Sequence, residues 1–229
     1  MKAPGVCSSR NTLGEPKGSL SVTQKSAAIY RKYHGDKADE RLGLFEGLVE
    51  RYGVDRVLYP GSFVHITPSF VIAEAVYVDS DKRAAAFFAD PGTVAFVRER
   101  RAYDSEPIIR FHHQDFATPI PEPDASFDLL ISQYAGFVSR DCKRYLRVGG
   151  YLVANNSHGD ASMARFDPDF ELVAVYRRYS ERFTFSSQEL DTYMIPRSGM
   201  EPDRMRLERE MRGPAFSRSV AGYVFVHNA

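Results

Sequence analysis

Residues 114–132 read QDFATPIPEPDASFDLLIS, and this stretch decides the fold class. Its last six residues, from Phe127 to Ser132, are nearly all apolar, whereas the part before them is rich in proline and acidic residues. A short apolar run bounded by proline and polar residues is typical of a strand that is buried on both faces. We therefore predict a central strand over residues 127–132.

Similar short apolar runs recur along the chain, at residues 56–59, 75–78, 108–111, 151–154, 170–176 and 222–226. Segments with apolar residues at steps of three and four separate most of them, and Ser80 or Asp81 can cap one such helix. This alternation predicts an α/β fold: a Rossmann-like, doubly wound, mostly parallel sheet of seven strands. Sheets of this kind bind ligands at the carboxyl ends of their strands, where the strand order reverses.

The length of 229 residues suits a single domain. Residues 1–22 are rich in Gly, Ser, Pro and Lys and predict a flexible arm, and residues 23–229 form the domain. Within it, residues 23–54 predict an N-terminal helical cap. Residues 177–219 predict an insertion with a charged helix, which is either a solvated surface helix or a lid over the ligand site.

The chain carries 30 Lys and Arg against 30 Asp and Glu, which argues against nucleic acid or an anionic membrane surface as a partner. No membrane span or signal peptide is apparent, and Cys7 and Cys142 lack metal-ligand spacing, so we expect a cytoplasmic protein with free thiols. His112 and His113 are neighbours on a predicted strand and face opposite sides, so no metal site is predicted. The oligomeric state is not specified by the sequence.

The stretch quoted above resembles a signature of the class I S-adenosylmethionine (SAM)-dependent methyltransferases, an acidic residue followed by L-P-F-P-D-x-S-F-D-x-V. Residues 145–153, YLRVGGYLV, are similar to the family's L-K-P-G-G-x-L turn into the fifth strand. The resemblance spans about residues 55–160. It implies SAM as the cofactor and transfer of its methyl group to a small-molecule acceptor.

The same resemblance assigns cofactor-binding roles. Asp79 would accept hydrogen bonds from the ribose hydroxyls, and Asp115 would accept one from the adenine amino group. Phe116 would stack on the purine, and Gly61 and Ser62 would belong to the first cofactor loop. Without a ligand, Asp79 is a helix cap and Asp115 is a solvated turn residue.

The first loop departs from the family pattern of an acidic residue followed by G-x-G-x-G. Residues 58–65 read LYPGSFVH, so Gly61 is the one glycine retained. Tyr59 takes the acidic position, and Phe63 and His65 replace the other two glycines. These side chains block the cofactor, reshape its site or contact another ligand. The alternatives are therefore a binding or scaffold domain that has lost SAM, and an enzyme of the same fold that uses another nucleotide.

Two histidines are candidate catalytic residues. His65 is either a general base at the ligand edge of the sheet or a buried histidine that satisfies a loop carbonyl. His158 could remove a proton from the acceptor, with Asp160 orienting it; otherwise this segment is a polar turn that caps the next helix. Asn156 and Tyr134 are candidate substrate-binding residues, and the alternative for Tyr134 is aromatic packing.

Overall fold

The computed structural model describes residues 22–34, 41–180, 182–200 and 202–228. The predicted arm lies outside these residues except for Val22, which begins the first helix. The sequence His34-Gly35-Asp36 also predicts a break between two N-terminal helices, and residues 35–36 lie outside the described part of the chain. The strands are β1 (Arg56–Pro60), β2 (Glu74–Val78), β3 (Ile108–His112), β4 (Phe127–Ser132), β5 (Leu146–Ala154), β6 (Phe170–Tyr179), β7 (Arg182–Ser186) and β8 (Gly222–His227).

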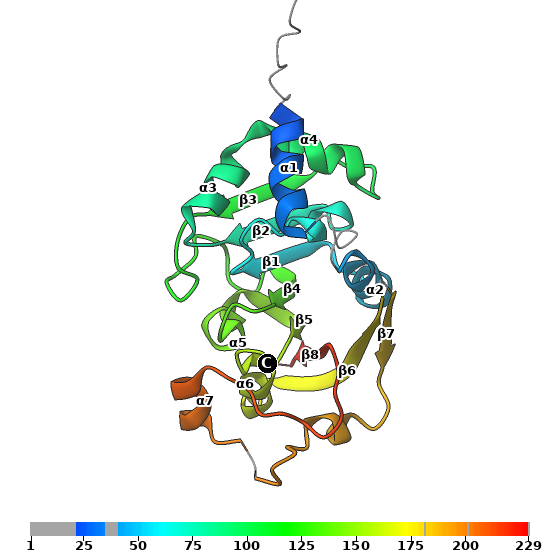
Figure 1. The fold of residues 1–229 in the computed structure, drawn as a ribbon, viewed down its shortest axis with the longest axis vertical. Helices are drawn as coiled ribbons and strands as arrows, with labels where there is room; N and C mark the ends of the chain where they lie inside the picture. Colours follow the sequence, from blue (N-terminus) through cyan, green and yellow to red (C-terminus); the bar gives the residue numbers. More distant parts are fainter. Residues whose placement is uncertain (1–21, 35–40, 181, 201, 229) are drawn as a thin grey trace, which may run out of the picture.

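The α-helices are α1 (Val22–His34), α2 (Leu42–Tyr52), α3 (Lys82–Ala89), α4 (Pro91–Arg100), α5 (Val138–Asp141), α6 (Asp160–Phe166) and α7 (Arg204–Glu210). Short 3₁₀ helices are η2 (Thr67–Phe70), η3 (Lys143–Tyr145) and η4 (Leu190–Met194). The sequence also predicts a helix near residues 142–146; in its place the structure has α5 and η3, which together lead into β5. Figure 1 shows the arrangement of these elements.

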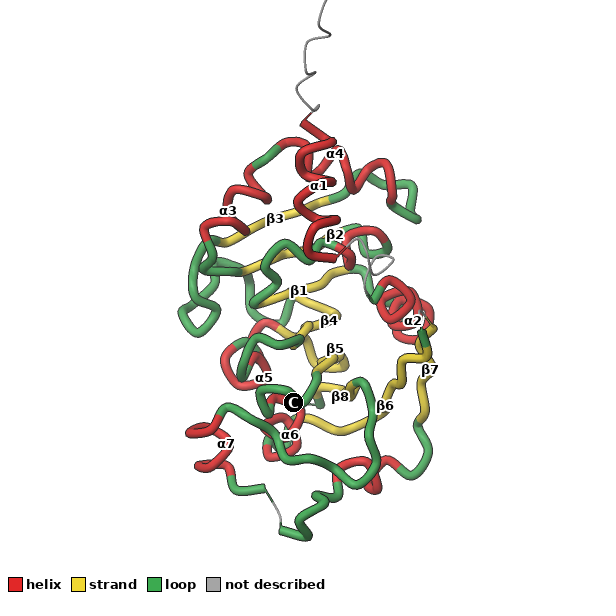
Figure 2. Tube along the Cα trace, in the orientation of Figure 1, coloured by secondary structure: helices red, strands yellow, loops and turns green. Residues whose placement is uncertain are grey.

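The strands form one sheet in the order β3-β2-β1-β4-β5-β8-β6-β7. The first five are parallel, whereas β8 joins β5 and β6 in antiparallel pairing and β7 pairs antiparallel with β6. The strand order reverses between β1 and β4, where the chain leaves one half of the sheet for the other (Figure 2). The predicted doubly wound, mostly parallel α/β fold is confirmed, with eight strands rather than seven.

The strand that was not predicted is β7, which lies within residues 177–219, the segment predicted as an insertion. Its residues alternate between half-buried and exposed, as expected of an edge strand with one covered face. Phe185 packs 6.0 Å from the Tyr176 ring, and a Cβ at Gly47 of α2 would lie 2.6 Å from its ring edge. Residues 182–186 are therefore part of the sheet, and the insertion proper begins after them.

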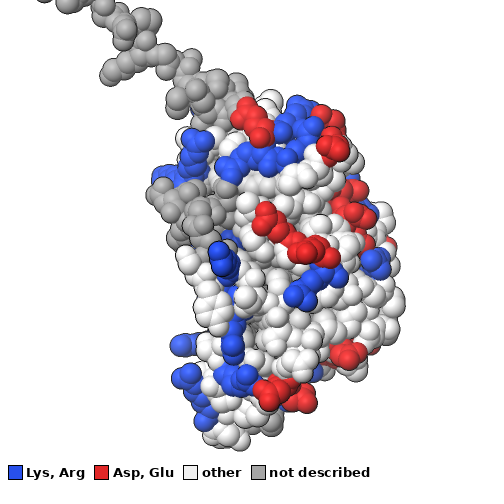
Figure 3. Space-filling view, turned by 90° about the vertical axis from the view of Figure 1, so that its right-hand side faces the viewer, with Lys and Arg blue, Asp and Glu red and all other residues white. Residues whose placement is uncertain are grey.

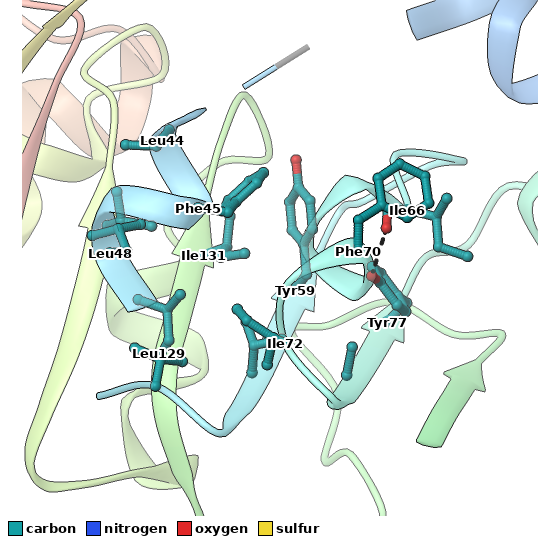
Figure 4. Close-up of a cluster of buried hydrophobic side chains, with 14 of the residues drawn as sticks. Leu44, Phe45, Leu48, Tyr59, Ile66, Phe70, Ile72, Tyr77, Leu129 and Ile131 are labelled. Carbon is teal, nitrogen blue, oxygen red and sulfur yellow. Dashed lines mark hydrogen bonds between the residues drawn. The ribbon is translucent and has the colours of Figure 1, made fainter. Parts of the chain in front are cut away.

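Alternate residues of the central strands feed two hydrophobic cores, one on each face of the sheet. On one face, Leu129, Ile131 and Tyr59 pack with α2, as Figure 4 shows for Leu44, Phe45 and Leu48. On the other face, Leu58, Leu130 and Leu152 pack against α5 and α6. Each large apolar side chain buried in this way contributes roughly 1.5–3 kcal/mol.

The predicted N-terminal helical cap consists of α1 and α2 on one face of the sheet. Tyr30 of α1 is buried against Phe70 and Phe96, and its hydroxyl lies 2.8 Å from the Thr67 hydroxyl. This packing fixes the last turn of α1 close to the loop that follows β1, which bears on the site below.

The proline-rich stretch before β4 is anchored by Glu122. Its carboxylate accepts hydrogen bonds from Arg56 and Arg110 and lies 2.9 Å from His112 Nε2. Burial raises the pKa of Glu122, but the hydrogen bonds from Arg110 and His112 outweigh burial and leave that pKa below its usual range. His112 is therefore a partner of a carboxylate that ties this loop to β1 and β3.

Candidate functional site

The carboxyl ends of β1, β2, β3, β4 and β5 meet at one edge of the sheet, and most of the candidate residues lie on the loops that leave this edge. The residues predicted from the sequence are Gly61, Ser62, His65, Asp79, Asp115, Phe116, Tyr134, Asn156 and His158. The structure brings most of them to this edge and places His65 in the core.

Gly61 begins the first loop in a left-handed conformation, with φ of +64°, and its N–H donates to the Val78 carbonyl at 2.8 Å. A Cβ at this position would lie 2.4 Å from the Ala135 Cβ. Glycine is therefore required here by direct packing against the loop after β4 as well as by backbone conformation. Ser62 is buried beside it, and its hydroxyl donates to the Phe63 carbonyl at 3.3 Å.

Asp79 joins the first loop to the end of β2. One carboxylate oxygen accepts the Phe63 N–H at 2.7 Å, and the other accepts the Asp81 N–H at 2.8 Å. The N-cap of α3 is Asp81, whose side chain accepts from the Arg83 N–H. Asp79 is half-buried beyond the end of β2 and is not the capping residue of α3.

Phe63 adopts a left-handed conformation, with φ of +48°. Its ring packs edge-on against Tyr33 of α1 at 4.9 Å, and the Arg83 guanidinium lies 4.9 Å from its centroid on another side. A non-glycine residue in this region costs about 1 kcal/mol or more, so the surrounding contacts must hold it there. Phe63, at the second glycine position of the family pattern, therefore places an aromatic ring that is held by contacts with α1 and Arg83.

Asp115 and Phe116 follow β3, the neighbour of β2. Asp115 is exposed, and its carboxylate accepts the Ala117 N–H at 2.9 Å within a tight turn. Phe116 is half-buried, and its ring edge lies 3.9 Å from the point where a Cβ of Gly61 would be. An exposed carboxylate and a half-buried aromatic ring therefore follow one another on the loop that leaves β3, the strand paired with β2.

His65 lies inside the protein, with 2% of its surface exposed. Its Nδ1 is 3.1 Å from the Tyr59 hydroxyl, and its ring packs at 4.6 Å from that of His34. This burial between β1, α1 and α2 favours the structural alternative for both His65 and Tyr59. Since a general base must reach its substrate, His65 in this position does not serve as one.

The loop after β4 combines a buried amide with an exposed ring. Gln133 is buried and donates to the Tyr176 hydroxyl at 3.0 Å, and its carbonyl oxygen accepts from Asn155 at 3.3 Å. Burial raises the pKa of Tyr176 to about 12, so its hydroxyl remains protonated at neutral pH. Tyr134, the next residue, is 60% exposed with φ of +62°, and the Arg41 guanidinium lies 5.2 Å from its ring.

The loop after β5 is held by its own polar groups. Asn156 accepts hydrogen bonds from the Ser162 N–H and hydroxyl through Oδ1, and Asn155 accepts from Ser157 in the same way. His158 is half-buried, and its Nδ1 lies 3.2 Å from the Ser157 hydroxyl. Of the two candidate catalytic histidines, His158 is therefore the one whose ring is partly exposed.

Asp160 has a different role from the orienting role that the sequence suggested. It is 2% exposed, and its carboxylate accepts from the hydroxyls of Ser132 and Ser139 and from the Ser139 N–H. Burial raises the pKa of Asp160 to about 6, against the opposing effect of these hydrogen bonds. Asp160 therefore fixes α6 to the end of β4 and to α5, and does not contact His158.

Residues 211–214, which we call the strap, cross the loops after β3 and β4. A Cβ added to Gly136 would lie 3.3 Å from Met211 Cε and 3.8 Å from Phe116 Cζ. The two side chains therefore pack at the same point beside the Gly136 backbone. Met211 was not predicted as a contact residue, because nothing in the charged pattern of residues 203–212 distinguishes it.

The strap also covers the loop after β5. Asn156 donates to the Pro214 carbonyl at 3.2 Å, and a Cβ at Gly159 would lie 3.2 Å from the Gly213 nitrogen. The preceding helix, α7, has one buried residue, Leu207, which packs with Phe137 and Met163 in a small separate cluster. Figure 1 shows α7 outside the sheet, next to α6.

Among the described residues, no group of three or more His, Cys, Asp or Glu side chains could hold a metal ion. Cys142, the residue that ends α5, is buried, and burial raises the pKa of its thiol. In the described part of the chain, no helix is both long and apolar enough to cross a membrane.

No protein-family model and no curated protein sequence matches this chain. Solved structures do match it. One is a Klebsiella pneumoniae protein assigned as an O-methyltransferase, which is 12% identical, with 93% of this chain and 92% of that chain covered and a TM-score of 0.51. A second is the O-methyltransferase TomG of Streptomyces achromogenes, in complex with SAM (14% identity, 73% and 88% covered, TM-score 0.49).

A third similar structure is the YcgJ protein of Bacillus subtilis, with 22% identity and a TM-score of 0.39; 58% of this chain matches 56% of that protein's length. The Klebsiella structure is matched over nearly all of both chains, and at 12% identity this likeness concerns the fold. Together with the strand order, it shows that the chain has the Rossmann-like fold of the class I methyltransferases.

Proposed function

We propose that the protein is a SAM-dependent methyltransferase that acts on a small-molecule acceptor. The observation that carries the proposal is Asp79, a half-buried carboxylate directly after β2, together with Asp115 and Phe116 on the loop that leaves the neighbouring strand β3. This is the combination that an adenosine group requires: acceptors for its ribose hydroxyls and amino group, and an aromatic face for the purine.

The fit to SAM differs between the two halves of the cofactor. Each Asp79 oxygen accepts one N–H and retains acceptor capacity, so Asp79, Asp115 and Phe116 suit the adenosine half. Ala135, on the loop after β4, packs directly on Gly61 of the first loop. A ligand group between these two loops therefore requires Ala135 to move. When bound, SAM supplies a methyl carbon on a sulfonium that leaves as a neutral thioether.

The chain's own residues have separable roles in this proposal. His158 would accept the proton that a hydroxyl or amine acceptor loses, since His65 is buried. Tyr134 and Asn156 lie on the loops after β4 and β5 and would contact the acceptor. The strap and α7, in the segment predicted as an insertion and possible lid, would exclude water from the transfer.

A second candidate function is a methyltransferase-like binding domain that has lost SAM. The contact between Ala135 and Gly61 and the ordered Phe63 ring favour it, because both fill space beside the cofactor loop. The two candidates can be distinguished by incubating the protein with SAM that carries a tritiated methyl group and with a mixture of small hydroxyl and amine acceptors. The quantities measured are the tritiated product and S-adenosylhomocysteine. A methyltransferase forms tritiated product and S-adenosylhomocysteine in equal amounts, whereas the binding domain forms neither.

A further inference from the structure

A continuous series of hydrogen bonds links the interior of the protein to His158 at the ligand edge. Its members are five side chains from β6 and from the loops after β4 and β5, in the order Tyr176, Gln133, Asn155, Ser157 and His158, and we call them the polar row. The first three are buried, the serine is exposed and the histidine is half-buried. The polar row therefore begins in the core and ends on the ring that the proposed function uses as a base.

One backbone group fixes the orientation of both amides in the polar row. The Ser157 N–H donates to Asn155 at 3.2 Å, and since an N–H can only donate, the Asn155 atom that receives it is the oxygen, Oδ1. Asn155 Nδ2 then donates to Gln133 Oε1 at 3.3 Å, which leaves Gln133 Nε2 to donate to the Tyr176 hydroxyl at 3.0 Å. The direction of each of these bonds therefore follows from that N–H, through the hydrogen-bond network.

The same amide oxygen fixes the direction of the bond to the histidine. Asn155 Oδ1 lies 2.7 Å from Ser157 Oγ, and because an amide oxygen carries no proton, the Ser157 hydroxyl donates to it. A hydroxyl has one proton, so Ser157 Oγ can only accept from its other neighbour, His158 Nδ1, at 3.2 Å. His158 Nδ1 therefore carries a proton, and in the neutral imidazole Nε2 is the nitrogen with the lone pair.

The other members of the polar row are neutral groups. They include Tyr176, whose pKa is raised by burial to about 12. The carboxylate of nearby Asp160 accepts from Ser132 and Ser139 and does not join the polar row. Charged side chains of both signs cover parts of the outer surface, as Figure 3 shows for the side that carries α2 and β7. Hydrogen-bond direction, and not an ion pair, therefore decides which nitrogen of His158 is protonated.

We propose that the polar row positions His158 with Nδ1 protonated and with Nε2 as the nitrogen that removes the acceptor's proton. In the described part of the chain, Nε2 makes no hydrogen bond of its own. During transfer, the acceptor's oxygen or nitrogen bonds to the methyl carbon, the electrons of the carbon–sulfur bond remain on sulfur, and the acceptor's proton passes to Nε2. Asn155 and Ser157 are positioning residues, since they act through His158. This inference rests on the proposed function, but the tautomer can be measured without SAM.

The test is nuclear magnetic resonance of the full-length protein with nitrogen-15 in its histidine rings, at about pH 8, where an ordinary histidine is neutral. Ring nitrogens with and without a proton differ in chemical shift, and comparison with His158→Gln identifies the signals of His158. We expect a proton on Nδ1 and none on Nε2. Ser157→Ala should give a mixture of both tautomers, and Ser157→Thr, which keeps a hydroxyl, should restore the single one.

The matched control is Ser126→Ala. The Ser126 hydroxyl donates to the Pro123 carbonyl at 2.7 Å, on the loop that enters β4 at the opposite edge of the sheet. This variant loses one serine hydrogen bond, as Ser157→Ala does, and should keep the His158 tautomer of the wild type. Asn155→Ala should behave like Ser157→Ala although its serine is intact, because without Oδ1 the Ser157 hydroxyl can donate to His158.

Methyl transfer from tritiated SAM to the mixture of small hydroxyl and amine acceptors gives a second measurement. Ser157→Ala should form product about tenfold more slowly than the wild type, as expected for the loss of one orienting hydrogen bond, and Ser157→Thr should recover most of the rate. The affinity of Ser157→Ala for S-adenosylhomocysteine should be that of the wild type. A changed tautomer without slower transfer would overturn the catalytic role of Nε2.

A proton on His158 Nε2 in the wild type would overturn the proposal, as would one tautomer shared by the wild type, Ser157→Ala and Asn155→Ala. Because Ser157 is exposed, its variant keeps the experiment decisive if Asn155→Ala does not fold. The predicted tautomer in a protein that does not bind S-adenosylhomocysteine would refute the proposed methyltransferase and leave the tautomer assignment intact. Binding of S-adenosylhomocysteine with the proton on Nε2 would refute the positioning role alone.

Discussion

The Phe63 N–H donates a hydrogen bond of 2.7 Å to the Asp79 carboxylate, which joins the altered loop after β1 to the acidic residue at the end of β2. In the family that the sequence resembles, glycine occupies the position of Phe63. Here the loop is ordered by a side chain that packs against α1 and by a backbone bond to the carboxylate. The acidic residue therefore organises the loop and remains available as a hydrogen-bond acceptor.

Replacement of Asp79 by Asn should weaken the binding of S-adenosylhomocysteine at least tenfold, because a neutral amide loses one acceptor oxygen and the negative charge. Calorimetric titration of the variant measures this change. Asp104→Asn, on an exposed loop, is the control and should leave the affinity unchanged. Equal affinity in Asp79→Asn and the wild type would show that Asp79 does not contact the ligand.

Gly61→Ala should destabilise the fold more than Gly53→Ala does. Both glycines have similar left-handed φ angles, +64° and +61°, but a Cβ at Gly53 meets nothing within 4 Å. The control change should cost about 1 kcal/mol for the backbone alone. Gly61→Ala adds the clash with Ala135, worth about 1–3 kcal/mol more in urea unfolding. Equal losses would mean that the loops after β1 and β4 are not in firm contact.

Leu207→Ala should release α7 and the strap from the loops that they cover. Leu207 is the buried residue of α7, and its contacts with Phe137 and Met163 form a small cluster apart from the main cores. Local opening of this kind needs little free energy, so trypsin should cleave at the arginines of α7 at least tenfold faster. Met205→Ala, at a residue 74% exposed, is the control; a similar cleavage rate in the two variants would contradict the anchoring role.

Asp160 should make the stability of the protein depend on pH. Burial raises the pKa of Asp160 to about 6, above its value in the unfolded chain, so the folded protein binds this proton more tightly. Raising the pH from about 4 to about 6 therefore removes stability, up to about 3 kcal/mol for a difference of two pKa units.

Asp160→Asn cannot ionise and can keep hydrogen bonds to Ser132 and Ser139, so it should lack this component. Urea unfolding of the wild type and the variant at several pH values between 4 and 7 measures the difference. The free energy of unfolding should fall more steeply with pH in the wild type. Parallel curves for the two proteins would show that Asp160 does not hold its proton in the folded state.

The sheet was predictable because its central strands are buried on both faces, so runs such as residues 127–132 are apolar throughout. Strand β7 was not predicted, because Phe183 and Phe185 alternate with polar residues over five positions and acquire a strand structure by pairing with β6. An edge strand of this length has too weak a pattern to be separated from a loop by sequence alone.

The candidate site was predictable where it depends on strand ends and not where it depends on distant contacts. Asp79 could be chosen because it directly follows the predicted strand 75–78, and Asp115 and Phe116 because residues 114–132 resemble the family signature. The packing of Ala135 on Gly61 and of Met211 beside Phe116 joins segments far apart in the sequence, and no local pattern encodes it. His65 was ambiguous because a histidine beside an apolar strand suits the core and the ligand edge equally well.

The central claim is that this edge of the sheet binds the adenosine-containing cofactor despite its altered loop. Isothermal titration of the wild-type protein with S-adenosylhomocysteine tests it most directly. The account predicts binding at one site per chain with a dissociation constant below about 1 mM, accompanied by a rise in the unfolding temperature at saturation. Absence of heat together with an unchanged unfolding temperature at several times that concentration would contradict it.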